Sequence, residues 1–197
     1  TLIIARVTDM IKLDNISFKY DNRLIVSELS HEFAENISSA ITGASGSGKT
    51  TLLNIILGLI KPDSGEIINL PDRISAVFQE DRLCEPYSAV KNVFAVTGKE
   101  ISEDKIVALL RELGLEGSEH LPVSTLSGGM RRRVAIARAL LAKSELVILD
   151  EPFKGLDEET RANVIDVINR YTKGKTLIVS THDIRDASDL GAEIFNL

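Results

Sequence analysis

The stretch Gly43-Ala-Ser-Gly-Ser-Gly-Lys-Thr50 (GASGSGKT) decides the fold of this chain. It matches G-x-x-x-x-G-K-[ST] in full and lies between a predicted strand, Ile37–Thr42, and an apolar segment, Thr50–Leu59, that predicts a buried helix. Such glycines let consecutive backbone N–H groups turn inward around phosphate oxygens, and the following helix offers its positive end. Lys49 is expected to reach the β- and γ-phosphates, and the Thr50 hydroxyl to complete a Mg²⁺ shell. The context disfavours the alternative, a flexible glycine-rich turn.

Composition narrows the class of protein. The 197 residues suffice for one domain with a substantial core, and 44% hydrophobic with 26% charged residues is typical of a soluble globular protein. The net charge of -6 argues against a general nucleic-acid binder, so no nucleic-acid partner is expected. The longest apolar stretch, Leu52–Ile60, contains Asn54 and falls short of the roughly 20 residues that a membrane span needs.

The N-terminus and the single cysteine lead to two further expectations. Met10 followed by Ile-Lys-Leu-Asp resembles a chain start, so residues 1–9 are either an upstream extension or a cloning artefact, and residues 1–10 are counted outside the domain. The first apolar residues are too few for a signal peptide. Cys84 cannot form an internal disulfide, which favours a reducing cytoplasm. We expect it to be a small buried residue rather than a nucleophile.

Strand and helix patterns alternate along most of the chain, which predicts an α/β fold with a mostly parallel sheet covered by helices. The remaining predicted strands are Ile11–Phe18, Leu24–Phe33, Glu66–Asn69, Arg73–Phe78, Leu146–Leu149, Thr176–Ser180 and Ile194–Leu197. The remaining predicted helices are Ala89–Val96, Ser102–Leu113, Gly129–Ala142, Glu158–Tyr171 and Asp183–Leu190. Residues 81–125 therefore look like a helical insertion between α/β segments.

Polar side chains follow three of the predicted strands, at the sheet edge where such folds bind ligands. Asp150 and Glu151 end a buried strand and should point opposite ways, so Asp150 could hold Mg²⁺ through water while Glu151 polarises an attacking water. His182 follows a second strand, and Gln79 follows a third and could reach the metal or the water. Alone, the carboxylates would be a solvated strand end and the histidine a structural residue; the phosphate loop favours the functional interpretation.

A second anion site is indicated by Leu126-Ser-Gly-Gly-Met-Arg-Arg-Arg-Val134. Ser127 is a good N-cap, two glycines follow, and an apolar run begins, as at a helix start built to receive an anion. The residues 131–133, all arginine, form a solvated helix face by default. The alternative is attraction of an incoming phosphate, because three cations in a first helical turn oppose the helix dipole.

These motifs together resemble the ATP-binding cassette of ABC transporters, from about residue 11 to residue 197. They occur in the family's order: Gly43–Thr50 (Walker A), Gln79 (Q-loop), Leu126–Met130 (signature), Leu146–Glu151 (Walker B), Gly155–Asp157 (D-loop) and His182 (switch histidine). The resemblance implies a P-loop NTPase fold with a RecA-like core, an antiparallel β subdomain and a helical subdomain. The α/β core would comprise residues 11–80 and 128–197, and the helical subdomain residues 81–127.

The resemblance also implies a composite ATP and Mg²⁺ site. The residues implied in ATP binding are Tyr20, which stacks on the adenine, Gly43, Ala44, Ser45, Gly46, Ser47, Gly48, Lys49, Thr50, Thr51, Ser127, Gly128, Gly129 and Asp157. Catalysis would fall to Glu151, His182 and Gln79, and Mg²⁺ to Thr50, Gln79 and Asp150. Two cassettes would close head to tail, each signature touching the partner's ATP, with Asp157 at the seam. Met130 stands where the family usually has Gln, which should weaken closure at most.

The expected function is that of the ATPase subunit of a membrane transporter, at the cytoplasmic face of the membrane. Its expected partners are transmembrane permease subunits and a second cassette, identical or not, and an extracytoplasmic solute-binding protein is a candidate partner. Val77–Leu83 and Glu151–Phe153 resemble the importer branch that handles nitrate, sulfonate or taurine-type solutes. The alternatives are a cassette of an export or cell-envelope complex and, less favoured, a DNA- or ribosome-associated ATPase.

Overall fold

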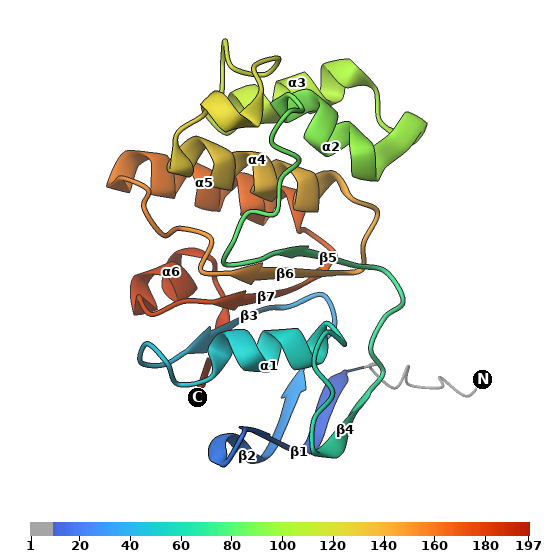
Figure 1. Cartoon of the computed structure of the whole chain (residues 1–197), viewed down its shortest axis with the longest axis vertical. Coiled ribbons are helices and arrows are strands. Elements are labelled where there is room, and N and C mark those ends of the chain that lie inside the picture. Colours follow the sequence, from blue (N-terminus) through green and yellow to red (C-terminus); the bar gives the residue numbers. More distant parts are fainter. Residues whose placement is uncertain (1–9) are drawn as a thin grey trace, which may run out of the picture.

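The computed structural model describes residues 10–197, and their elements form two sheets with helices on both sides of the larger one (Figure 1). The larger sheet is parallel, with the strand order β5 (Ile74–Val77), β6 (Leu146–Asp150), β7 (Thr176–Ser180), β3 (Ser38–Thr42) and β8 (Glu193–Asn196). The smaller sheet is antiparallel, with the order β2 (Arg23–Phe33), β1 (Ile11–Tyr20) and β4 (Ser64–Ile68). The α/β fold with a separate antiparallel portion is confirmed.

The parallel sheet is buried on both faces. Helix α1 (Lys49–Ile56) lies between the two sheets and packs its Leu52 and Ile56 into one core cluster. Helices α4 (Gly128–Leu141) and α5 (Glu158–Tyr171) cover the opposite face. All five residues of β6 are buried, as expected for a strand covered on both sides.

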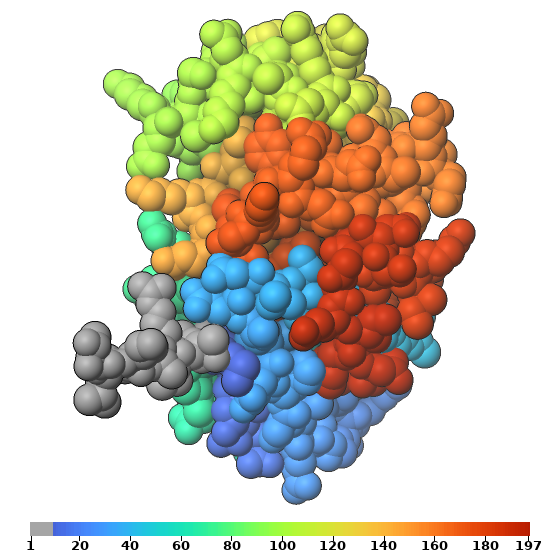
Figure 2. Space-filling model, turned by 180° about the vertical axis from the view of Figure 1, so that it is seen from behind, coloured from blue at the N-terminus to red at the C-terminus, as the bar shows by residue number. Residues whose placement is uncertain are grey.

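The helical segment forms the layer farthest from the antiparallel sheet. It contains α2 (Ala89–Thr97) and α3 (Glu103–Glu112), which begin at N-caps Ser88 and Ser102, and two 3₁₀ turns that the sequence did not predict, Gly98–Glu100 and Val123–Thr125. Helix α4 contacts α2 and α3 as well as the sheet, so it joins the two parts of the molecule. Seen from behind, the helical segment, the α5 layer and the N-terminal strands follow one another from top to bottom (Figure 2).

The structure also tests the expectation for Cys84 and the expected absence of a membrane span. Cys84 is exposed, so the prediction of a small buried residue is wrong; its backbone N–H and carbonyl instead bond the side chain of Asn92. The interpretation of residues 1–9 lies outside the described residues. Within residues 10–197, no helix has the length and apolar character that crossing a membrane requires.

A short helix, α6 (Ile184–Asp189), follows β7 and leads to β8.

Candidate nucleotide site

The phosphate loop connects β3 to α1 and turns on left-handed glycines. Gly48, which precedes the first residue of α1, has φ 106°, and a Cβ there would come 3.0 Å from Cγ2 of Ile25 in β2. Only glycine combines that backbone conformation with so close an approach. The loop is therefore packed against the antiparallel sheet, at the carboxyl edge of the parallel one.

Two side chains in this loop fit an anion. Lys49 is 6% exposed, and its ammonium donates only to its own loop, to the carbonyls of Gly43 (2.8 Å) and Ala44 (3.0 Å); none of the ion pairs among residues 10–197 includes it. A buried cation without a counter-charge is costly. The Ser47 hydroxyl is buried without a hydrogen-bond partner in the described part of the chain. Both are explained by a bound phosphate group.

A hydroxyl and a carboxylate meet beside the loop, where a divalent cation would bind. The Thr50 hydroxyl lies 2.8 Å from Oδ2 of Asp150, and the Ser180 hydroxyl donates to Oδ1 at 2.5 Å. These are the hard oxygen ligands that Mg²⁺ takes together with phosphate oxygens. Sequence reasoning missed Ser180. The pairing of Asp150 with Ser180 across β6 and β7 was the available signal, because both strands were predicted to end at that edge.

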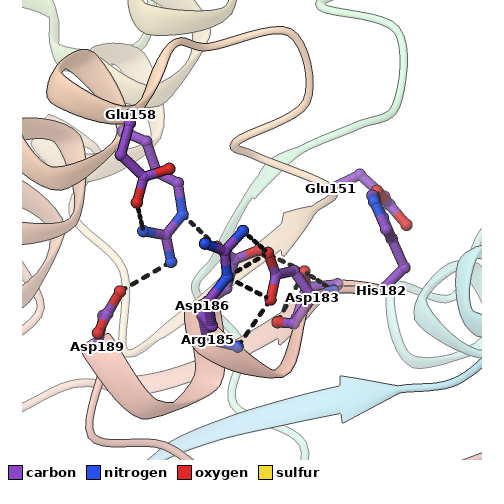
Figure 3. Close-up of polar contacts among 9 residues, drawn as sticks. Glu151, Glu158, His182, Asp183, Arg185, Asp186 and Asp189 are labelled. Atoms are coloured by element: carbon purple, nitrogen blue, oxygen red, sulfur yellow. Dashed lines mark hydrogen bonds and ion pairs between the residues drawn. The ribbon is translucent and has the colours of Figure 1, made fainter.

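The two consecutive carboxylates diverge. Glu151 leaves β6 with φ 49°, and its N–H donates to the Ser180 carbonyl (3.2 Å) and hydroxyl (3.0 Å). Its Oε2 lies 2.8 Å from Nδ1 of His182, which follows β7 (Figure 3). A left-handed backbone in a non-glycine residue is uncommon and costs free energy, which is typical of functional sites. Asp150 thus faces Thr50 while Glu151 pairs with the histidine.

An ion-pair network, buried at Arg161 and Asp186, supports the loop that carries His182. Arg161 of α5 pairs with Asp186 at 2.6 Å and with Asp189 at 2.8 Å, both in α6 (Figure 3). The Thr181 hydroxyl, next to His182, donates to the other oxygen of Asp186. The network fixes α6 and the end of β7 against α5. Nothing in the sequence pattern pointed to Arg161.

The helix start at Ser127 belongs to a different cavity. The Ser127 hydroxyl accepts from the Met130 N–H at 3.3 Å, so the predicted N-cap is confirmed. Gly128 and Gly129 line a cavity of about 650 Å³ together with Gln79 and Gly155, and no residue of the phosphate loop lines it. Within residues 10–197, the Gln79 side chain makes no hydrogen bond to Thr50 or Asp150. The structure thus brings Gln79 to the signature, and its role as a metal ligand stays a prediction.

The prediction of a solvated arginine face is wrong for two of the three arginines. Arg132 is 6% exposed and donates to the carbonyls of Phe78 and Gln79. Arg133 donates to the carbonyls of Leu113 and Gly114, behind α3. Arg131 is partly exposed and pairs with Glu85. The arginines at the start of α4 therefore bind backbone carbonyls and carboxylates of the same chain.

Two predicted residues of the nucleotide site lie at the surface. Tyr20 ends β1, is 50% exposed and packs edge-on against Phe18, with ring centroids 4.8 Å apart. Asp157 is the N-cap of α5, where its carboxylate accepts from the N–H and hydroxyl of Thr160. These bonds hold the pKa of Asp157 below its usual value. Capping of α5 is thus the structural role of the Asp157 carboxylate. A role of Asp157 at a seam between two cassettes stays a prediction.

The anion-binding loop, the Thr50–Asp150 pair and the Glu151–His182 pair lie at one edge of a parallel sheet, and together they define a P-loop nucleotide-binding protein. The family model described as ABC transporter matches residues 26–154. The chain belongs to the ABC transporter family, so the family predicted from the motifs is confirmed.

Curated relatives and a solved structure agree with this membership. The chain is 40% identical over 189 residues to the aliphatic sulfonates import ATP-binding protein SsuB 2 of Pseudomonas savastanoi pv. phaseolicola, covering 93% of this chain and 69% of the relative. It is 34% identical over 203 residues to the spermidine/putrescine import ATP-binding protein PotA of Mycoplasma capricolum, covering 94% of this chain but only 58% of the relative's length. A dimeric structure of a post-hydrolysis state of the ATP-binding cassette MJ0796, bound to ADP and Pi, is 32% identical with a TM-score of 0.81, covering 95% and 94% of the two chains.

Proposed function

We propose that this protein is the ATP-binding and ATP-hydrolysing subunit of a bacterial solute importer, and that two cassettes close on ATP to drive transport. The observation that carries the proposal is the Glu151–His182 contact at 2.8 Å, beside the Thr50–Asp150 pair. A site that only bound nucleotide would need the Thr50–Asp150 pair but not the Glu151–His182 contact. The names of the relatives, which are import ATP-binding proteins, support the transport role.

Hydrolysis would depend on the divided roles of the two carboxylates. Glu151 would accept a proton from the attacking water, and the His182 contact would hold its carboxylate in one orientation. Asp150 is 4% exposed and held by two hydroxyls, so it is suited to a metal rather than to proton transfer. Mg²⁺, when bound by Thr50 and Asp150, would offset charge on the phosphates. For Gln79 to serve as a further Mg²⁺ ligand, its side chain would have to move toward Thr50 and Asp150.

Nucleotide binding would use the buried lysine and an exposed aromatic ring. Lys49 would exchange its two loop carbonyls for phosphate oxygens, gaining the counter-charge that it lacks among residues 10–197. Tyr20 presents an exposed ring at the end of β1, as a stacking surface for adenine requires. The backbone N–H groups between Gly43 and Thr51 would surround the phosphates.

Dimer closure explains why the signature does not face its own phosphate loop. Ser127 and Gly128 are exposed at the positive end of a 14-residue helix, next to a cavity that holds none of the phosphate-loop residues. We infer that they bind the γ-phosphate held by a partner cassette. Met130 supplies only its backbone N–H to the Ser127 cap, so the replacement of the family's glutamine leaves these contacts in place.

A permease would dock on the helical segment at the inner face of the membrane. Four large apolar side chains of this segment are exposed, namely Tyr87, Phe94, Val96 and Leu121. Tyr87 and Leu121 each precede one partner of the antiparallel bridge between Ser88 and Pro122, which brings their two chain segments together. Exposed apolar side chains gathered in one segment are typical of protein interfaces. The sulfonate relative, at 40% identity against 34% for the spermidine/putrescine relative, favours an organic anion as the solute, recognised by the permease or by a solute-binding protein.

The test is phosphate release by the purified protein with MgATP. The wild-type protein should hydrolyse ATP. The Glu151→Gln variant should hydrolyse ATP about 10²–10³-fold more slowly. It should still bind ATP, and with ATP it should elute as a dimer in size-exclusion chromatography. Glu159→Gln, an exposed carboxylate on α5, is the matched control and should behave as wild type. A Glu151→Gln protein that stays monomeric with saturating ATP would contradict the closure model.

A further inference from the structure

The segment between β5 and α2 is held by side chains instead of by secondary structure. Residues 78–84 form neither helix nor strand, yet they carry Gln79 and lead into the helical segment. Arginines of α4 hold this segment at several points. Arg131 pairs with the Glu85 carboxylate at 3.0 Å, whereas Arg132 and Arg138 bind backbone carbonyls.

Arg132 makes the central contacts. Its Nη1 donates to the Phe78 carbonyl at 2.5 Å, its Nη2 to the Gln79 carbonyl at 2.6 Å, and its Nε lies 3.3 Å from the Asp81 carboxylate. The side chain is only 7% exposed. A planar guanidinium holds two neighbouring acceptors in a fixed geometry, which glutamine or lysine cannot reproduce. Arg132 thus fixes the backbone on which the Gln79 side chain is mounted.

Arg138, about two turns further along α4, extends the attachment. Its Nη2 donates to the Asp81 carbonyl at 3.0 Å and its Nη1 to the Arg82 carbonyl at 2.8 Å. Arg82 has φ 47°, an uncommon conformation for a residue with a side chain. Four of the five carbonyls from Phe78 to Arg82 therefore accept hydrogen bonds from one helix. That helix begins at Gly128, directly after Ser127.

We propose that Arg132 is a positioning residue that makes Gln79 and the Ser127 helix start one rigid unit. The inference rests on the proposed function, in which Gln79 serves the ATP held by its own chain and Ser127 serves the ATP held by the partner. A movement of Gln79 toward its own nucleotide then moves the signature helix of the same chain. Arg132 in this way links the two ATP sites of the closed dimer.

A double-mutant cycle with Gln79 tests the kinetic half of the proposal. Arg132→Gln should lower kcat of MgATP hydrolysis about tenfold in the wild-type background, with ATP affinity within about twofold. In the Gln79→Ala background the same change should lower kcat less than about twofold, because the residue through which Arg132 acts is gone. Arg170→Gln, on the exposed face of α5, should change neither value. Independent, multiplicative losses would overturn the proposal.

A spin label tests the positional half without any hydrolysis. The label is attached at Glu80→Cys in a Cys84→Ser background, since Cys84 is the chain's single cysteine. The spectrum should show an immobile label in the protein that retains Arg132 and a mobile label in the Arg132→Gln variant. The Arg132→Lys variant, which keeps the charge but loses the planar guanidinium, should give a label of intermediate mobility. A label equally mobile in all three proteins would overturn the rigid unit. A protein that shows the expected spectra but hydrolyses no ATP would instead contradict the proposed function alone.

Discussion

Replacing Arg161 by Met should destabilise the fold through one buried ion pair. Arg161 and Asp186 meet at 2.6 Å with side chains 10% and 7% exposed. Without the guanidinium, the Asp186 carboxylate keeps the Thr181 hydroxyl as its one side-chain donor among the described residues. Leaving a buried charge uncompensated costs about 3–5 kcal/mol, a large part of the about 5–15 kcal/mol by which domains are stable. Because Thr181 precedes His182, ATP hydrolysis should fall as well.

The assay is urea unfolding followed by circular dichroism, with Arg170→Met as the matched control. Arg170 lies on the same helix and pairs with Glu112 at the same kind of distance, 2.8 Å, but its side chain is 58% exposed. Its loss should cost about 0–1 kcal/mol. The double variant Arg161→Met/Asp186→Leu should recover part of the lost stability, because both buried charges are then removed. Equal losses for Arg161→Met and Arg170→Met would refute the reasoning.

Three further outcomes follow from the site. Ser180→Ala removes the hydroxyl shared by Asp150 and the Glu151 N–H, and should lower kcat about tenfold with little change in ATP affinity, as measured by phosphate release and nucleotide titration. The Arg185 hydrogen bond lowers the pKa of Asp183 from 3.8 to about 2, so the stability from this group is present above about pH 4 and is lost as pH falls toward 2. The melting temperature of Asp183→Asn should therefore lie below that of wild type at pH 7 and approach it near pH 2; a constant difference would count against this pair. Ser127→Arg should abolish hydrolysis while nucleotide binding stays within about threefold, and lost binding would mean that Ser127 belongs to its own chain's site.

The strands and helices were predictable because each signal is local. The glycine loop needs a strand before it and a helix after it, and the apolar run of β6 predicts a strand covered on both faces. Once those strands are parallel, the residues that end them must share one sheet edge. This rule brought Asp150, Glu151 and His182 together in advance, and it would also have yielded Ser180 had the register of β6 and β7 been considered.

The contacts that hold the site depend on distant partners and left no pattern. Arg161 reads as one more polar residue on an amphipathic helix, since its partners in α6 lie about 25 residues further along the chain. The left-handed turn at Glu151 is equally hidden, because no glycine or asparagine marks it. Both arise from the packing of α5 and α6 on the sheet. Local propensity and periodicity contain no information about them.

The arginines of α4 show why charge patterns in a helix mislead without the neighbouring backbone. A run of three arginines is by default a solvated helix face, and the opposed helix dipole indicated a phosphate as the alternative partner. The adjoining segment 78–84 has no secondary structure to satisfy its carbonyls, and partly buried carbonyls are more stable with donors. Arg132, near the start of α4, and Arg138, in its last turn, supply these donors. A loop that must be both irregular and fixed therefore predicts buried arginines on the helix beside it, and the test is whether Arg132→Gln frees the loop.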